Sequence, residues 1–144
     1  MSISRDPFYK WNDKVILIAE DDLHSYNLLY EILKNTSCSI IHTLDGVSAF
    51  VNCIRSVKID LVLLDIKLPR LDGYETARLI KKHRPEIPII AQTAHAMVPD
   101  RERCIKFGCD EYFAKPFNIK QFMATLDNYL GNQRRERIAP EFLF

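Results

Sequence analysis

The chain has 144 residues, of which 47% are hydrophobic and 27% charged, and its formal net charge is +1. This composition indicates one globular domain with a substantial core, and the near-neutral charge gives no electrostatic reason to expect binding to nucleic acid or a membrane. No apolar run is long enough to span a membrane, and the polar, aromatic N-terminus does not have the pattern of a signal peptide.

The four cysteines do not form a metal-binding pattern. The chain contains no CxxC pair, and Cys104 and Cys109 are five residues apart with no histidine nearby. Unpaired cysteines of this kind are typical of reduced thiols in the cytosol, so we expect a cytoplasmic protein.

Three segments are expected along the chain. Residues 1–13 form a lead-in whose aromatic side chains Phe8, Tyr9 and Trp11 either pack on the domain or belong to a partner interface. Residues 14–131 form the domain. Residues 132–144 form a C-terminal tail that is too short for a second domain.

Five short apolar segments are typical of buried strands. Val15–Ala19 and Leu61–Leu64 are continuous aliphatic runs of the kind found in parallel sheets that are covered on both faces. We expect the other three strands at residues 39–44, 88–93 and 112–114.

Segments with helical spacing of apolar residues separate these strands. The spacing i, i+3, i+4, i+7 first appears from residue 26 to 33, and it returns after a turn at Asp45-Gly46. We expect further helices at residues 74–83, at 100–107 before Gly108, and after Asn118, which can cap the last of them. Strands that alternate with helices in this way predict an α/β fold with a parallel sheet.

The residues suited to chemistry stand directly after these strands. Right-handed crossovers place the carboxyl ends of all the strands at one edge of a parallel sheet, where ligands of open sheets bind. The residues that we expect to surround one pocket at this edge are Glu20, Asp21, Asp22, Asp65, Thr93 and Lys115.

The carboxylates of this set predict a cation site. Two carboxylates about 4 Å apart repel each other by roughly 4 kcal/mol at an effective dielectric near 20, so a cation or a proton must offset the cost. Mg²⁺ suits such a site because it takes one or two carboxylates together with waters and phosphate oxygens. A solvated acidic turn is the ordinary alternative, and the position of Glu20-Asp21-Asp22 directly after a buried strand favours metal binding.

The other residues at the edge suit a phosphoryl group. Lys115 precedes Pro116, which holds its backbone extended, so its ammonium can pair with Asp65 and with a phosphoryl group bound there. Thr93 offers a hydroxyl group to a phosphoryl oxygen. Tyr112 is either a core aromatic or a movable one, and the sequence leaves this open.

Together these motifs resemble the receiver domain of bacterial two-component response regulators. The resemblance covers residues 14–131 and implies a flavodoxin-like, CheY-like sheet of five parallel strands in the order 2-1-3-4-5. The run Ile90–Met97 looks more like receivers attached to hybrid sensor histidine kinases than like free-standing regulators. The matching motifs, in the family's order and spacing, are Glu20-Asp21-Asp22, Leu63 to Pro69 with Asp72-Gly73, Thr93-Ala94 and Lys115-Pro116-Phe117.

The resemblance implies that Asp65 is the phosphoacceptor. The phosphoryl group would come from a phosphohistidine on a sensor histidine kinase or a histidine phosphotransfer protein. The implied ligands of Mg²⁺ are Asp21, Asp22, Asp65 and the backbone carbonyl of Lys67.

The resemblance also implies how phosphorylation changes the surface. Thr93 and Lys115 would bind the phosphoryl oxygens, and coupled movement of Thr93 and Tyr112 would remodel the surface of the fourth helix, fifth strand and fifth helix for a downstream protein. Lys67 and His95, two residues beyond Asp65 and Thr93, flank the phosphoryl site and are expected to affect how long the phosphoryl group survives.

Two other classes of function fit less well. A Mg²⁺-dependent phosphohydrolase usually has a second aspartate where this chain has Lys67, and it needs a cap domain. A flavin-binding protein would have a phosphate-binding loop rather than an acidic one after the first strand, and a degenerate receiver would have lost Asp65, Lys115 or an acidic residue. We therefore expect a signalling switch that works through protein partners, not an enzyme, and no direct binding of nucleic acid or membrane.

Overall fold

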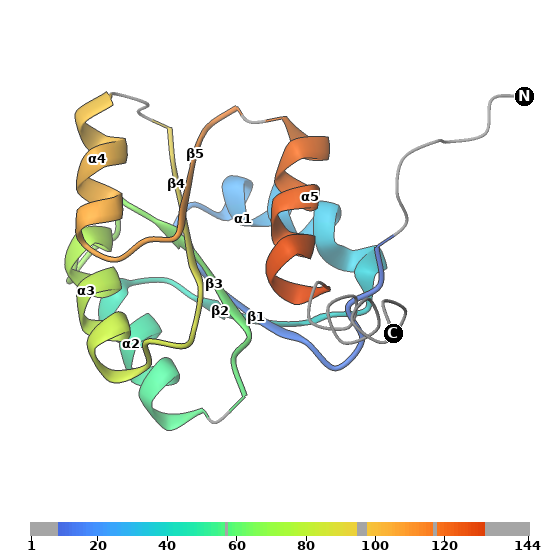
Figure 1. Ribbon diagram of the computed structural model, residues 1–144, viewed down its shortest axis with the longest axis horizontal. Coiled ribbons are helices and arrows are strands. Elements are labelled where there is room, and N and C mark those ends of the chain that lie inside the picture. Colours follow the sequence, from blue (N-terminus) through green and yellow to red (C-terminus); the bar gives the residue numbers. More distant parts are fainter. Residues whose placement is uncertain (1–8, 57, 95–97, 117, 132–144) are drawn as a thin grey trace, which may run out of the picture.

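A sheet of five strands forms the centre of the computed structural model, and helices cover both of its faces (Figure 1). The structure describes residues 9–56, 58–94, 98–116 and 118–131. The strands are β1 (Val15–Ala19), β2 (Ser39–Thr43), β3 (Leu61–Asp65), β4 (Ile89–Thr93) and β5 (Glu111–Ala114). The helices are α1 (Leu23–Leu33), the short 3-10 helix η1 (Lys34–Thr36), α2 (Gly46–Arg55), α3 (Gly73–His83), α4 (Val98–Lys106) and α5 (Ile119–Leu130).

The strand order is β2-β1-β3-β4-β5, and every neighbouring pair is parallel, which confirms the predicted fold class and order.

The helix predicted at residues 100–107 begins earlier, at Val98. Pro99 then falls in the first turn of α4. A helix tolerates proline there because the backbone N–H groups of the first turn have no acceptor within the helix, so the N–H that proline lacks is not missed. None of the helices in the described ranges is long and apolar enough to cross a membrane.

Side chains of the central strands alternate between two apolar cores. In β1, Leu17 and Ala19 face the core under α2, α3 and α4, whereas Ile16 and Ile18 face the core under α1 and α5. Figure 1 shows the same division of the helices between the two faces. A central strand therefore has no polar side, which is why its sequence is a continuous aliphatic run.

Four helices begin with the same side-chain contact. Each of Asp22, Asp45, Asp72 and Asn118 accepts a hydrogen bond from the backbone N–H three residues later, at 2.9, 2.7, 2.9 and 2.9 Å respectively. Such caps satisfy N–H groups that have no partner within the helix. Asp45, predicted as part of a turn with Gly46, therefore also starts α2.

Gly108 ends α4, as predicted, with a φ of 109°. Its N–H donates to the carbonyl of Ile105 (3.0 Å), and the N–H of Cys109 donates to the carbonyl of Cys104 (2.9 Å). These are the two bonds of a Schellman ending, which requires a residue that tolerates positive φ. Cys104 and Cys109 meet across this ending as buried free thiols.

Trp11 ties the lead-in to the domain. Its side chain is 1% exposed and packs into the core under α1 and α5. The indole Nε1–H donates to Oδ1 of Asp127 in α5 (2.9 Å), and the backbone N–H donates to the carbonyl of Thr36 (2.7 Å). Tyr9 stacks on the indole ring with centroids 5.7 Å apart. Packing on the domain is therefore the role found for Tyr9 and Trp11, while Phe8 lies outside the described residues.

We expect Trp11→Ala to lower the free energy of unfolding by about 3–5 kcal/mol, the usual loss when a buried aromatic side chain is removed. Trp11→Phe keeps an aromatic ring but loses the hydrogen bond to Asp127, so its loss should be only about 1–2 kcal/mol. Urea denaturation followed by circular dichroism measures both changes. A Trp11→Ala protein as stable as wild type would mean that residues 9–13 do not belong to the folded unit.

Candidate functional site

The carboxyl edge of the sheet carries the predicted polar residues from four strands. Glu20 directly follows β1, Asp65 ends β3, Thr93 ends β4 and Lys115 directly follows β5. The residues Glu20, Asp65 and Thr93 are 0%, 8% and 2% exposed, so three polar groups are held away from water here. Buried polar groups require hydrogen-bond or ionic partners, and contacts between residues at this edge provide several of these partners.

The loop after β3 folds tightly over Asp65. The N–H of Gly73 donates to the carbonyl of Ile66 (2.9 Å), and a Cβ at Gly73 would lie only 2.7 Å from the carbonyl oxygen of Asp65. A side chain at this position would push the loop off the strand. The tight loop also directs the N–H of Lys67 at Oδ1 of Asp65 (3.1 Å), which fixes the orientation of that carboxyl group.

The pKa of Asp65 is raised from its ordinary value of 3.8 to about 7, mainly because the carboxyl group is buried and further because of its hydrogen bond with Glu20 and the negative charge of Glu20. The N–H of Lys67 and the positive charge of Lys115 act in the opposite direction. A carboxyl group that gains this much from a proton also gains from a cation, because both relieve its repulsion with Glu20.

Three carboxylates form one group. Oxygen atoms of Glu20, Asp21 and Asp65 all lie within 4.8 Å of one another. Glu20 and Asp65 are buried, while Asp21 is exposed and faces the solvent side of the group. Carboxylate oxygens at this spacing, open to water on one side, fit a hard divalent cation that keeps part of its hydration.

Lys115 is held by Glu20. Its Nζ donates to Oε1 of Glu20 (2.9 Å), and the side chains are 21% and 0% exposed. The second carboxylate oxygen of Glu20 accepts the N–H of Asp22 (3.2 Å). These two bonds give the buried charge of Glu20 its partners and hold the ammonium group of Lys115 at the edge of the sheet.

Asp22 has a different place from the one predicted for it. Its Oδ2 accepts hydrogen bonds from the backbone N–H (2.9 Å) and the hydroxyl (2.8 Å) of Ser25, and these bonds hold its pKa below the ordinary range. It is the exposed N-cap of α1, and in the part of the chain that the structure describes it is not among the three grouped carboxylates. Glu20 stands there instead.

Thr93 and Tyr112 lie on the same face of the sheet. Tyr112 pairs in register with Ala91, which is two residues before Thr93 on β4, and it packs half-buried against the core under α2, α3 and α4. Burial raises the pKa of its hydroxyl group, and nearby Asp100 adds to this effect. Coupled movement of Thr93 and Tyr112 remains a prediction. His95 lies outside the described residues.

A contact between α3 and α4 beside this site was not predicted. The hydroxyl of Tyr74 donates to Oδ1 of Asp100 (3.0 Å), and the guanidinium of Arg103 lies 4.2 Å from the centre of the Tyr74 ring. These residues, with Lys67 and Thr93, help to line a cavity of about 250 Å³. The contact depends on how α3 and α4 pack against each other, and no local sequence pattern predicts it.

Comparisons with known proteins agree on one family. The model of the response regulator receiver domain matches residues 16–127. The polar-differentiation response regulator DivK of Brucella anthropi is 34% identical over 121 residues, which cover 83% of this chain and 98% of DivK.

Solved structures of receiver domains have the same fold. The receiver domain of sensor histidine kinase PA1611 from Pseudomonas aeruginosa, which has a magnesium ion coordinated in its active-site cleft, is 32% identical with a TM-score of 0.75, over 82% of this chain and 98% of that one. A CheY-like receiver domain protein from Methanospirillum hungatei is 26% identical with a TM-score of 0.76, over 85% of this chain and 98% of that one. The chain therefore belongs to the receiver domain family of response regulators, the phosphorylatable switches of two-component signalling.

Proposed function

We propose that Asp65 is the phosphoacceptor of this receiver domain. A carboxylate oxygen of Asp65 attacks the phosphorus atom of a phosphohistidine, the P–N bond breaks, and the imidazole leaves with a proton taken up from solvent. The product is an acyl phosphate. The observation that carries this proposal is the buried Asp65 carboxyl grouped with Glu20 and Asp21, beside the ammonium of Lys115.

Mg²⁺ is the proposed cofactor, and the residues that would hold it are Glu20, Asp21 and Asp65. The backbone carbonyl of Lys67 remains a further candidate. When bound, the ion neutralises charge on the phosphoryl oxygens. The donor set fits, because it consists of carboxylate oxygens within 4.8 Å of one another, two of them buried and one exposed.

Lys115 has a second task in this proposal. Its ammonium holds the carboxylate of Glu20 in the unphosphorylated state. A phosphoryl group on Asp65 brings nearly two negative charges and three acceptor oxygens to the same edge. Lys115 then donates to a phosphoryl oxygen, and the hydroxyl of Thr93 binds another.

The phosphoryl charge biases the rest of the domain through Thr93 and Tyr112. Thr93 moves toward the phosphoryl group, and Tyr112 turns into the space on the same face of the sheet. The surface of α4, β5 and α5 changes as a result, and a downstream protein binds it. The upstream partner is a sensor histidine kinase or a histidine phosphotransfer protein in the cytoplasm, and residues 14–131 carry the function.

Three single substitutions test the proposed metal ligands. Asp21→Asn and Glu20→Gln are expected to weaken Mg²⁺ binding by roughly tenfold or more, since each removes one charge from a site that attracts the ion mainly by charge. Asp22→Asn keeps a capping side chain and should leave the affinity nearly unchanged. Isothermal titration calorimetry on the three variants and wild type measures this order. If the Asp22→Asn protein binds Mg²⁺ as weakly as the Asp21→Asn protein does, Asp22 is a ligand of the ion after all.

The proposed phosphoacceptor is tested by phosphorylation of wild type and Asp65→Asn with a small phosphodonor. Because this reaction needs no kinase, it examines Asp65 independently of the upstream partner.

A further inference from the structure

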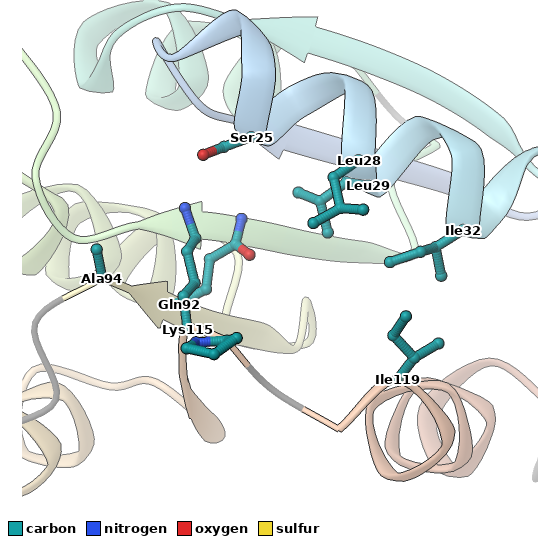
Figure 2. Close-up of a pocket in the computed structure, with 9 residues that line it drawn as sticks. Ser25, Leu28, Leu29, Ile32, Gln92, Ala94, Lys115 and Ile119 are labelled. Carbon is teal, nitrogen blue, oxygen red and sulfur yellow. The ribbon is translucent and has the colours of Figure 1, made fainter.

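A cavity of about 470 Å³ lies between α1 and the carboxyl ends of β4 and β5. This volume is within the range of small-molecule sites, about 300–1,000 Å³. Figure 2 shows the apolar side of the cavity, where residues of α1 face the first residue of α5 across the opening. These apolar residues are Leu28, Leu29, Ile32 and Ile119.

Gln92 supplies one of the polar groups of the cavity wall. Its side chain is 0% exposed, and neither Oε1 nor Nε2 has a hydrogen-bond partner among the described residues. In Figure 2 its amide group lies beside Lys115 and is directed toward α1. A buried amide without a partner is costly, because its hydrogen bonds to water have been lost and not replaced.

The other polar groups that line the cavity have partners. The hydroxyl of Ser25 donates to Asp22 at 2.8 Å, and the ammonium of Lys115 donates to Glu20 at 2.9 Å. Among the described residues that line the cavity, the side-chain groups without a partner are therefore the two N–H bonds and the carbonyl oxygen of one amide, while the lining cation is already paired. A neutral ligand suits this wall better than an anion does.

We propose that this cavity binds a small, flat, apolar molecule that carries a lactam or primary carboxamide edge. Such an edge has an N–H beside a C=O, so it can donate to Oε1 and accept from Nε2 of Gln92 at the same time. A carboxylate could satisfy only the N–H groups, and a hydrocarbon would satisfy neither atom. The aliphatic side chains of α1 and Ile119 cover the faces of the ring.

Of the residues that we assign to phosphorylation, only Lys115 lines this cavity. The proposed phosphoacceptor and its carboxylate group do not line the cavity, whose residues come from α1, β4, the segment after β5 and the start of α5. Lys115 borders both regions, since it lines the cavity and bonds to Glu20. Binding can therefore be measured on the unphosphorylated protein without metal, where failure says nothing about Asp65.

The test uses two compounds that differ by one methyl group, 2-quinolinone and 1-methyl-2-quinolinone. The methyl group removes the N–H and blocks the edge. We expect 2-quinolinone to shift the NMR signals of the Gln92 side-chain amide and of the methyl groups of Leu28, Leu29 and Ile119. The methylated compound should bind about tenfold more weakly, the loss expected for one net hydrogen bond.

Gln92→Leu is the matched protein variant. It should fold and unfold at a higher temperature than wild type, because it replaces a buried polar group that has no partner with an apolar one. It should also bind the two compounds equally. The proposal is overturned if wild type binds both compounds equally, if the preference persists in Gln92→Leu, or if 2-quinolinone at its solubility limit leaves the cavity signals unshifted, as a cavity that holds only water would.

Discussion

Asp65→Asn is expected to abolish phosphoryl uptake. In acetyl phosphate and Mg²⁺, wild type should gain the mass of one phosphoryl group, and the Asp65→Asn protein should gain none, because a neutral amide does not attack phosphorus as a carboxylate does. Intact-protein mass spectrometry measures both results. Removal of Mg²⁺ with a chelator should also prevent uptake by wild type, since the incoming charge is then poorly neutralised.

Asp60→Asn is the matched control for this experiment. Asp60 lies just before β3, at the opposite end of the strand from Asp65, and its Oδ2 accepts the backbone N–H of Val15 (2.8 Å). The amide oxygen of Asn can keep that bond, so Asp60→Asn should be phosphorylated like wild type. A folded wild type that takes up no phosphoryl group would contradict the role of Asp65, and uptake by Asp65→Asn would assign it to another residue.

The fold could be predicted from the sequence because its strands are buried on both faces. Val15–Ala19 and Leu61–Leu64 cannot be amphipathic when helices cover the sheet twice, so they appear as unbroken aliphatic runs. The alternation with helices and the handedness of crossovers then restrict the possible strand orders. The ends of helices are harder to predict from the sequence, because a helix such as α4 can begin before its apolar spacing does.

The acidic triplet shows what a residue pattern leaves undecided. The residues Glu20, Asp21 and Asp22 all follow β1, and the family resemblance implies the two aspartates as ligands. Glu20 continues the face of Ile16 and Ile18, which the structure buries under α1 and α5, so its carboxylate meets Asp65. Ser25, three residues after Asp22, was the available signal that Asp22 caps a helix.

Other residues could not be found by local reasoning because their partners are distant in the chain. Trp11 packs into the core and bonds to Asp127, and Tyr74 meets Arg103 only because α3 and α4 lie together. Gln92 lies within an otherwise apolar strand, and a single polar residue in such a strand does not by itself indicate a binding site. Only the packed structure shows that its amide has no partner among the described residues.

Asp65 is expected to make the metal-free protein less stable as pH rises from about 4 to 8. Folding raises the pKa of Asp65 from 3.8 to about 7, so the folded state holds this proton more tightly than the unfolded chain does. The stabilisation is therefore complete below pH 3.8 and is lost as pH rises through about 7. At about 1.4 kcal/mol per pKa unit, the loss in the free energy of unfolding is about 4 kcal/mol.

Asp65→Asn separates this effect from that of the other carboxyl groups. Asn carries no titrating proton, so the variant should match wild type below about pH 3.8, where Asp65 is protonated in both the folded and the unfolded state, and it should exceed the stability of wild type by several kcal/mol at pH 8. Urea denaturation in EDTA measures both comparisons. Mg²⁺ at pH 8 should recover much of the wild-type loss, since it binds only the folded site, and should change the variant far less. Equal pH dependence in both proteins would mean that Asp65 ionises normally and that the carboxylate group holds no stored repulsion for a cation to relieve.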